Sequence, residues 1–199
     1  MSAPLVLVGC GILQKEVDFL IRKNGWPVMT CWLRSALHNY FDQLYKELDQ
    51  GLLDAEQAGQ RAVAFYGACH PRMDQLLQSH HTCRTEGQNC VAMLLGYELF
   101  MERLCQGSYF LLEDWALSWE PMITECFGPN ISVIREIFHA SHKTMVAIRT
   151  PCSGDFAQAA EAAARLVDLP LEWMEVDLDH LERVLAAVIA QTEPQDPPR

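Results

Sequence analysis

The sequence predicts an α/β protein, a single three-layer domain with a mostly parallel sheet and helices on both faces. Short aliphatic runs of strand length alternate with longer stretches of helical period, as repeated βα units require. The first run, Leu5 to Gly9, is continuously apolar, which is typical of a parallel strand buried on both faces. Half of the 199 residues are hydrophobic, enough for one sizeable core. We expect one domain over residues 1–192 and a disordered tail over residues 193–199.

The later strands are expected where apolar and β-branched residues cluster between turn residues. Right-handed crossovers would place every strand-to-helix turn at one edge of the sheet. The predicted strands after the first are residues 27–33, 62–66, 81–84, 109–112, 144–149 and 171–176.

Helices are expected where apolar residues recur every three or four positions. The helix after the first strand ends at Asn24-Gly25. Residues 38–50 form a second helix that Gly51 is expected to end, and residues 52–60 form a further short helix or connector. The remaining predicted helices are residues 73–78, 90–95, 98–105, 119–127, 131–138, 156–167 and 181–191.

Composition and charge indicate which partners and which cell compartment the protein is expected to have. The chain has 15 basic and 26 acidic residues and a formal net charge of -11, which disfavours nucleic acids and anionic membranes as partners. Its apolar runs are far shorter than the roughly 20 residues of a membrane-spanning helix. The N-terminus lacks the basic start and long apolar stretch of a signal peptide. We expect a cytoplasmic protein without membrane association.

Eight cysteines are present, and in a reducing compartment they are not expected to form structural disulfides. No Cys-x-x-Cys motif occurs, so any shared cysteine site has to be assembled from distant segments. Cys105 and Cys126 lie in amphipathic helical stretches, where a free cysteine is expected to be a small buried hydrophobic residue.

Three other cysteines are predicted to share a site. Cys10 ends the first strand, Cys69 follows the Ala62–Tyr66 strand, and Cys90 begins an apolar helix after Asn89, which can cap it. Ligands of open α/β sheets bind beyond the carboxyl ends of the strands, where these thiols are expected to converge. Glycines precede the first two cysteines and let the backbone approach a bulky group closely.

Thiolates are soft ligands that select iron–sulfur clusters, zinc or copper(I). Three cysteines on a four-iron, four-sulfur cluster leave one iron open to a substrate, and this is the favoured interpretation. Zinc with three cysteines and an open position is the alternative. A reactive thiol at the helix N-terminus of Cys90 also stays open.

Further polar residues follow predicted strands and are candidates for substrate binding. An anionic small molecule is the expected ligand, because arginines form bidentate contacts with carboxylates and phosphates. The candidates are His70, Arg72, Arg84, Asp114 and Cys152.

Alternative readings remain for some of these polar residues. His70 fits equally a turn residue hydrogen-bonded to backbone, and Asp114 a helix N-cap. Residues 80–83, with two histidines and a cysteine, resemble a second metal cluster but fit better as a loop.

The cysteine segments resemble those of a protein family of unknown function, DUF1638. The resemblance lies in Val8-Gly9-Cys10, in the turn Tyr66-Gly67-Ala68-Cys69, in Asn89-Cys90 before a helix closing on Leu94-Leu95-Gly96, and in Leu112-Glu113-Asp114-Trp115. It spans roughly Leu5 to Ile148. Where other members have glycine and aspartate, this chain has His70 and Asn89.

The resemblance implies three shared cysteines and a place beside corrinoid-dependent methyltransferase systems in one-carbon metabolism. We therefore expect an iron–sulfur protein, with Cys10, Cys69 and Cys90 as ligands, that binds or transforms a small metabolite or passes electrons to a corrinoid partner. The alternatives are a zinc-thiolate methyl-transfer protein and a non-catalytic binding or assembly module for a corrinoid protein.

Overall fold

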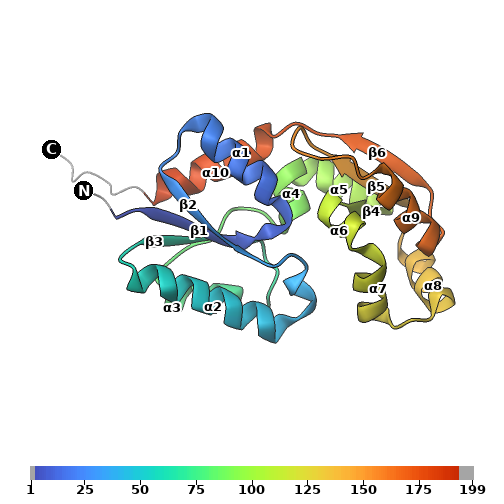
Figure 1. Ribbon diagram of the computed structural model, residues 1–199, viewed down its shortest axis with the longest axis horizontal. Helices are drawn as coiled ribbons and strands as arrows, with labels where there is room; N and C mark the ends of the chain where they lie inside the picture. Colours follow the sequence, from blue (N-terminus) through green and yellow to red (C-terminus); the bar gives the residue numbers. More distant parts are fainter. Residues whose placement is uncertain (1–2, 193–199) are drawn as a thin grey trace. The chain divides into compact units, whose positions relative to one another are not determined.

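A computed structural model describes residues 3–192 and confirms the α/β class (Figure 1). Its strands form two parallel three-stranded sheets. The contacts between Cα atoms divide the chain into two compact units, one formed by residues up to Leu94 and from Asp179 onward, the other by Leu95–Leu178. The expectation of one domain over residues 1–192 stays a prediction, and the tail predicted over residues 193–199 lies outside the described residues.

The sheet of the first unit has the strand order β2-β1-β3. Its strands are β1 (Leu5–Cys10), β2 (Val28–Leu33) and β3 (Arg61–Phe65). All pairings are parallel, and the central strand is almost completely buried, as its unbroken aliphatic run predicts.

Helices cover both faces of this sheet (Figure 1). On one side lie α1 (Gln14–Asn24) and α10 (Asp179–Gln191), and on the other α2 (Phe41–Gln57) and α3 (Met73–Ser79). Two 3-10 turns, Gly11–Leu13 and Leu37–Asn39, precede α1 and α2. The predicted end of α1 is confirmed, because Gly25 follows it in the left-handed conformation with a φ of 62°.

Gly51 does not end a helix, contrary to the prediction. It lies inside α2, where an added Cβ would stand 2.8 Å from Val8 Cγ1 of the central strand. The apolar face continues past it through Leu52 and Ala55, both buried. Burial of that face outweighs the roughly 1 kcal/mol by which glycine disfavours a helix interior, so one long helix replaces the expected two.

The outer edge of β3 is covered by an extended segment instead of a full strand. Ala64 and Arg84 form an isolated parallel bridge, in which Ala64 N–H donates to Cys83 O at 3.0 Å and Thr85 N–H to Ala64 O at 3.0 Å. The strand predicted at residues 81–84 is thus reduced to this bridge. The segment leads to α4 (Cys90–Leu95), the helix that carries Cys90.

The second unit holds a parallel sheet of order β4-β5-β6. Its strands are β4 (Ser108–Leu111), β5 (Thr144–Arg149) and β6 (Leu171–Glu175). Its helices are α5 (Tyr97–Cys105), α6 (Glu113–Leu117), α7 (Trp119–Phe127), α8 (Ile131–Ser141) and α9 (Ala157–Val167).

Helices pack on both faces of this sheet as well. Side chains of α6 to α9, among them Trp119, Phe138 and Ala160, form one buried cluster with Met145 and Ala147 of β5. On α5, Phe100 stacks on Phe110 of β4, with ring centroids 5.5 Å apart.

Two sheets replace the one continuous sheet that the alternating pattern predicted. Within residues 3–192, the outer edge of β3 makes only the bridge at Arg84, and β4 pairs with β5. Asp114 and Cys152 follow β4 and β5, which belong to the second sheet, whereas Cys10 ends β1 of the first sheet.

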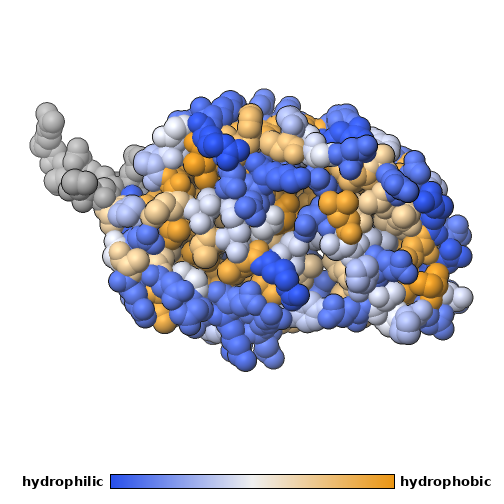
Figure 2. Space-filling view, viewed as in Figure 1, coloured by the Kyte–Doolittle hydropathy of each residue, from blue (hydrophilic) through white to orange (hydrophobic). Residues whose placement is uncertain are grey.

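The surface agrees with the acidic composition. On the face shown in Figure 2, hydrophilic residues cover much of the surface, with hydrophobic patches between them. Within residues 3–192, no helix is long and apolar enough to cross a membrane. Cys105 and Cys126 are exposed, so the prediction that they are buried small hydrophobic residues is wrong. Both lie in the last turns of their helices.

Candidate functional site

The carboxyl edge of the first sheet gathers two of the three predicted cysteines. Cys10 is the last residue of β1, and Cys69 lies four residues beyond the end of the neighbouring β3. Both pack against the same buried cluster, which includes Val8 and Ala64. The parallel pairing of β1 with β3 therefore brings the two thiols to one region, as the strand pattern predicts.

A close backbone contact joins the Cys69 turn to the segment before Cys90. Ala68 N–H donates to Gln88 O at 2.9 Å. An added Cβ on Gly67 would stand 2.3 Å from the same oxygen and 2.7 Å from Asn89 Cα, so only glycine fits there. Gly9, by contrast, makes room for the side chain of Phe65. The glycines before the cysteines thus permit close packing within the protein itself.

Cys90 is the first residue of α4, and Asn89 caps that helix as predicted. Asn89 Oδ1 accepts the Ala92 N–H at 2.9 Å, and Met93 N–H donates to Asn89 O at 3.0 Å. At the other end of the segment, His180 of α10 contacts Met93 O through Nδ1 at 2.9 Å. These contacts hold the N-terminus of α4 where the Gly67 turn meets it.

The thiol of Cys90 is affected by the charges of the other two cysteines. Burial raises the pKa of Cys90 well above its usual range, and the charges of Cys10 and Cys69 raise it further, while backbone hydrogen bonds at the helix N-terminus oppose this. Burial likewise raises the pKa of Cys69, although a backbone hydrogen bond from Gly67 and the charge of Arg84 lower it. The three cysteines therefore form one electrostatic group, which we call the Cys10 group.

The Cys10 group has the donor chemistry of a thiolate metal site but not its finished geometry. All eight cysteines are free of disulfides, and soft thiol donors suit an iron–sulfur cluster or zinc. Among residues 3–192, no three His, Cys, Asp or Glu side chains are arranged so that they could hold a metal ion as they stand. The Cys10 group therefore fits a metal by its donor atoms, and its side chains would have to move to bind one.

Arg84 is the predicted arginine that lies near the Cys10 group. Its charge lowers the pKa of Cys69, although burial prevails in the balance. Its Nη1 donates to Gly87 O at 3.1 Å, and its Nε lies 3.6 Å from the exposed carboxylate of Asp74. Arg84 thus places positive charge beside Cys69 while it also holds the loop before Asn89.

His70 and Arg72 pack against side chains at the N-terminal end of α2. His70 Nδ1 accepts the Arg72 N–H at 2.9 Å, which agrees with the reading of His70 as a turn residue bonded to backbone. Its ring packs against Phe41 and Tyr45, and the Arg72 guanidinium lies 4.6 Å from the centroid of the Tyr45 ring. Burial, together with the charge of Arg72, lowers the pKa of His70.

Asp114 and Cys152 belong to the second unit. Asp114 lies in the first turn of α6, whose N-cap is Leu112, so Asp114 is not the predicted N-cap, and Cys152 lies in the turn after β5. The neighbouring Glu113 accepts the Gly154 N–H at 3.1 Å, and Asp155 accepts the Ala157 N–H at the start of α9. Carboxylates of the chain itself thus accept hydrogen bonds from two backbone N–H groups just before and at the start of α9, the kind of donors that bind anions at helix N-termini.

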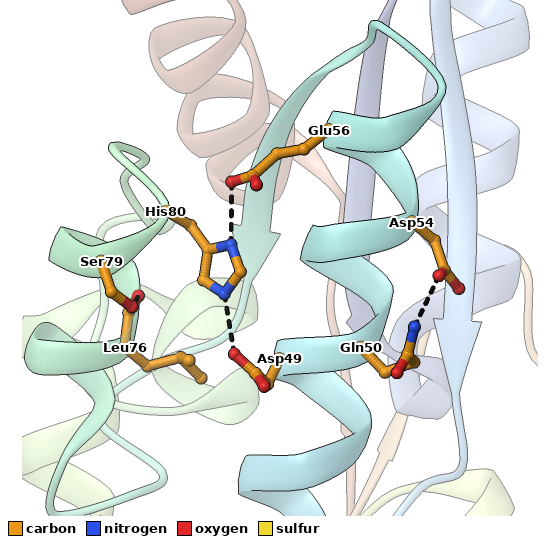
Figure 3. Close-up of polar contacts among 7 residues, drawn as sticks. All are labelled: Asp49, Gln50, Asp54, Glu56, Leu76, Ser79 and His80. Atoms are coloured by element: carbon orange, nitrogen blue, oxygen red, sulfur yellow. Dashed lines mark hydrogen bonds and ion pairs between the residues drawn. The ribbon is translucent and has the colours of Figure 1, made fainter.

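Sequence reasoning missed a histidine bridge in the first unit. His80, at the end of α3, contacts Glu56 through Nδ1 and Asp49 through Nε2, each at 2.8 Å (Figure 3). These carboxylates raise the pKa of His80 against the opposing effect of burial. Asp49 and Glu56 are seven residues apart on one face of α2, a spacing that could have indicated the bridge. His80 therefore binds two carboxylates, and does not form the metal cluster that residues 80–83 resemble in sequence.

Comparison with known proteins gives one family. A model of the family described as a protein of unknown function, DUF1638, matches residues 32–185, which begins and ends later than the expected resemblance. Cys69 and Cys90 lie inside the match, and Cys10 precedes it. No match was found among curated proteins or among solved structures. Because the match covers well over half of the sequence, the chain belongs to the DUF1638 family.

Proposed function

We propose that Cys10, Cys69 and Cys90 hold an iron–sulfur cluster, with four iron and four sulfide atoms favoured, in which one coordination position stays open. The observation that carries the proposal is that Cys10 and Cys69 pack against one buried cluster, while a backbone contact holds the Cys69 turn against the residues that precede Cys90. All eight cysteines are free of disulfides, so these three thiols are available as soft ligands, which suit an iron–sulfur cluster.

The residues of the chain supply three properties that such a group needs. The thiols supply ligands, and the N-terminus of α4 stabilises negative charge at Cys90 through its backbone N–H groups. The Gly67 contact fixes the distance between the Cys69 turn and α4. When bound, the cluster would supply an open iron as a Lewis acid or a path for one electron.

The ligand of the open position is proposed to be a small carboxylate or phosphate. Arg84 brings positive charge to Cys69 in a chain whose formal net charge is -11, so it creates a local field that attracts an anion. Arg72, whose guanidinium lies over the Tyr45 ring, is a second candidate contact, with His70 beside it. Asp114 and Cys152 stay candidates for substrate binding.

The setting proposed for this chemistry is cytoplasmic one-carbon metabolism, with a corrinoid methyltransferase protein as partner. The cluster would then bind or transform the metabolite or pass electrons to the corrinoid protein. Nucleic acid is not proposed as a partner, because the acidic chain would be repelled by phosphate backbones.

Metal and sulfide analysis after anaerobic purification tests the proposal. We expect a brown protein with about four iron and four acid-labile sulfide atoms per chain. Alanine at Cys10, Cys69 or Cys90 should abolish the visible absorbance, and Cys105→Ala and Cys126→Ala should serve as controls that keep it, since both residues are exposed helix-end cysteines. A colourless wild-type protein with stoichiometric zinc would replace this proposal by the zinc-thiolate alternative. A protein that stays metal-free after reconstitution would favour the third alternative, a non-catalytic binding or assembly module.

Binding of the anionic ligand has its own test. Metabolites with carboxylate or phosphate groups are titrated calorimetrically into the metal-loaded wild-type protein and into Arg84→Ala and Arg72→Ala. We expect weaker binding in Arg84→Ala without loss of metal, because the positive charge beside Cys69 is removed. Equal affinity in both variants would show that these arginines serve only the Asp74 and Tyr45 contacts.

A further inference from the structure

A buried hydroxyl without a hydrogen-bond partner lies beside the Cys10 group. Tyr66 is only 4% exposed, and within the described part of the chain its hydroxyl oxygen is fully buried and makes no hydrogen bond. Buried hydroxyls normally have a partner, because removal from water without one costs free energy. The hydroxyl is therefore a buried donor for which the described part of the chain supplies no acceptor.

The register of the sheet places Tyr66 next to Cys10. Val8 of β1 pairs with Ala64 of β3, and both belong to the buried cluster that also contains Tyr66. Side chains two residues apart on a strand point to the same face. Cys10 and Tyr66 each lie two residues beyond that pair, so their side chains point to the same face of the sheet from neighbouring chain segments. Cys10 and Cys69 both pack against this cluster.

The electrostatics agree with this placement. Burial raises the pKa of Tyr66, and the charges of Cys10 and Cys69 raise it further. A phenol keeps its proton at neutral pH even without such effects. The hydroxyl is therefore a protonated hydrogen-bond donor at the same cluster as Cys10 and Cys69, and it is not bonded to either thiol in the metal-free chain.

We propose that Tyr66 is a positioning residue whose O–H donates a hydrogen bond to the sulfur-ligated group held by Cys10 and Cys69. The inference rests on the proposed function, because the acceptor is either a ligand sulfur in its metal-bound position or a sulfide of the cluster. Donors to such sulfurs stabilise the added electron and raise the reduction potential. Outer-sphere donors also contribute to metal retention, typically by 10-fold or more.

The test compares wild-type protein with Tyr66→Phe, which keeps the ring and removes only the hydroxyl. Tyr45→Phe is the matched control, since Tyr45 packs against the same cluster and its hydroxyl is not among the orphaned atoms. Each protein is reconstituted anaerobically with ferrous iron and sulfide. The readouts are the melting temperature of the metal-free protein, the rate of iron loss to a chelator and the reduction potential.

We expect metal-free Tyr66→Phe to melt at the wild-type temperature or above it, because the variant has lost an unsatisfied buried donor. After loading, it should lose iron about 10-fold faster than wild type and show a lower reduction potential. Tyr45→Phe should match the wild type in both. A lower melting temperature of the metal-free variant, with unchanged iron retention and potential, would overturn the inference and give Tyr66 a structural role.

Failure of the proposed function has a different signature. If the wild-type protein takes up Zn²⁺ but no iron and sulfide, the iron–sulfur function fails, and the same three proteins are compared by chelator competition for zinc. There, 10-fold weaker retention in Tyr66→Phe supports the inference and equal retention refutes it. Wild-type protein that binds neither iron and sulfide nor Zn²⁺ refutes both.

Discussion

Gly67→Ala should disrupt the contact that brings the Cys69 turn to the start of α4. The new Cβ would stand 2.3 Å from Gln88 O, 2.5 Å from Gln88 C and 2.7 Å from Asn89 Cα. A carbon and a carbonyl oxygen rarely approach closer than about 3.3 Å. All three overlapping atoms are backbone, so no side chain can rotate to relieve the clash, and one segment has to move by about 1 Å.

The cost follows from two contributions. Overpacking of a well-packed site costs about 1–3 kcal/mol. The hydrogen bond from Ala68 N–H to Gln88 O spans the same gap, and its distortion adds about 1 kcal/mol. We therefore expect Gly67→Ala to lower the free energy of unfolding by about 3 kcal/mol and to increase the reactivity of Cys69 and Cys90 toward a thiol reagent.

Urea denaturation and thiol titration of the metal-free protein measure both effects. Gly25→Ala is the matched control: nothing lies within 4 Å of its added Cβ, and only the φ of 62° opposes it, at a cost of about 1 kcal/mol. The reasoning fails if Gly67→Ala is no less stable than Gly25→Ala, or if its thiols react at the wild-type rate.

Three further predictions follow from other contacts. The folded-state pKa of His80 is raised above the unfolded value near 6.5, so the ion pairs of His80 stabilise the fold by about 1 kcal/mol below pH 6.5, and this stability is lost as the pH rises through the folded pKa. In urea unfolding, His80→Gln should lack this dependence on pH, and parallel wild-type and variant curves would refute the prediction. Asn89→Ala removes the cap of α4 and should cost about 1 kcal/mol in urea unfolding, whereas an unchanged midpoint would contradict the capping role. Air should bleach the visible absorbance of the anaerobically purified protein and release iron, because the open iron is accessible to oxidants, and air-stable colour would argue against an open position.

Local patterns predicted most elements of the fold. The strand Thr144–Arg149 and the helix Cys90–Leu95 have the predicted bounds, because apolar runs and flanking turn residues act within a few positions. The prediction that Gly51 ends a helix is wrong, because the place of Gly51 inside α2 depends on its contact with Val8 of another element. The division into two sheets depends on which strands pair, and alternating strands and helices fit one sheet or two equally well.

The candidate site was predictable where it follows strand ends. Cys10 and Cys69 come together because β1 and β3 are neighbours, and Cys90 joins them through the backbone contact at Gly67. The position of Asp114 and Cys152 was not predictable in the same way, because it required knowledge of the sheet to which β4 and β5 belong. In the sequence, Tyr66 stands out only as part of the Tyr66-Gly67-Ala68-Cys69 turn of the family resemblance, and its role as a donor is indicated only by its buried hydroxyl.

A crystal structure of the anaerobically purified protein, with anomalous diffraction recorded at the iron absorption edge, tests most directly whether the three cysteines share a cluster. We expect iron peaks bonded to the sulfurs of Cys10, Cys69 and Cys90, with one iron that has no protein ligand and the Tyr66 hydroxyl directed at a sulfur. Sulfurs of these three cysteines that point to different regions, or iron bound elsewhere in the chain, would contradict the proposal.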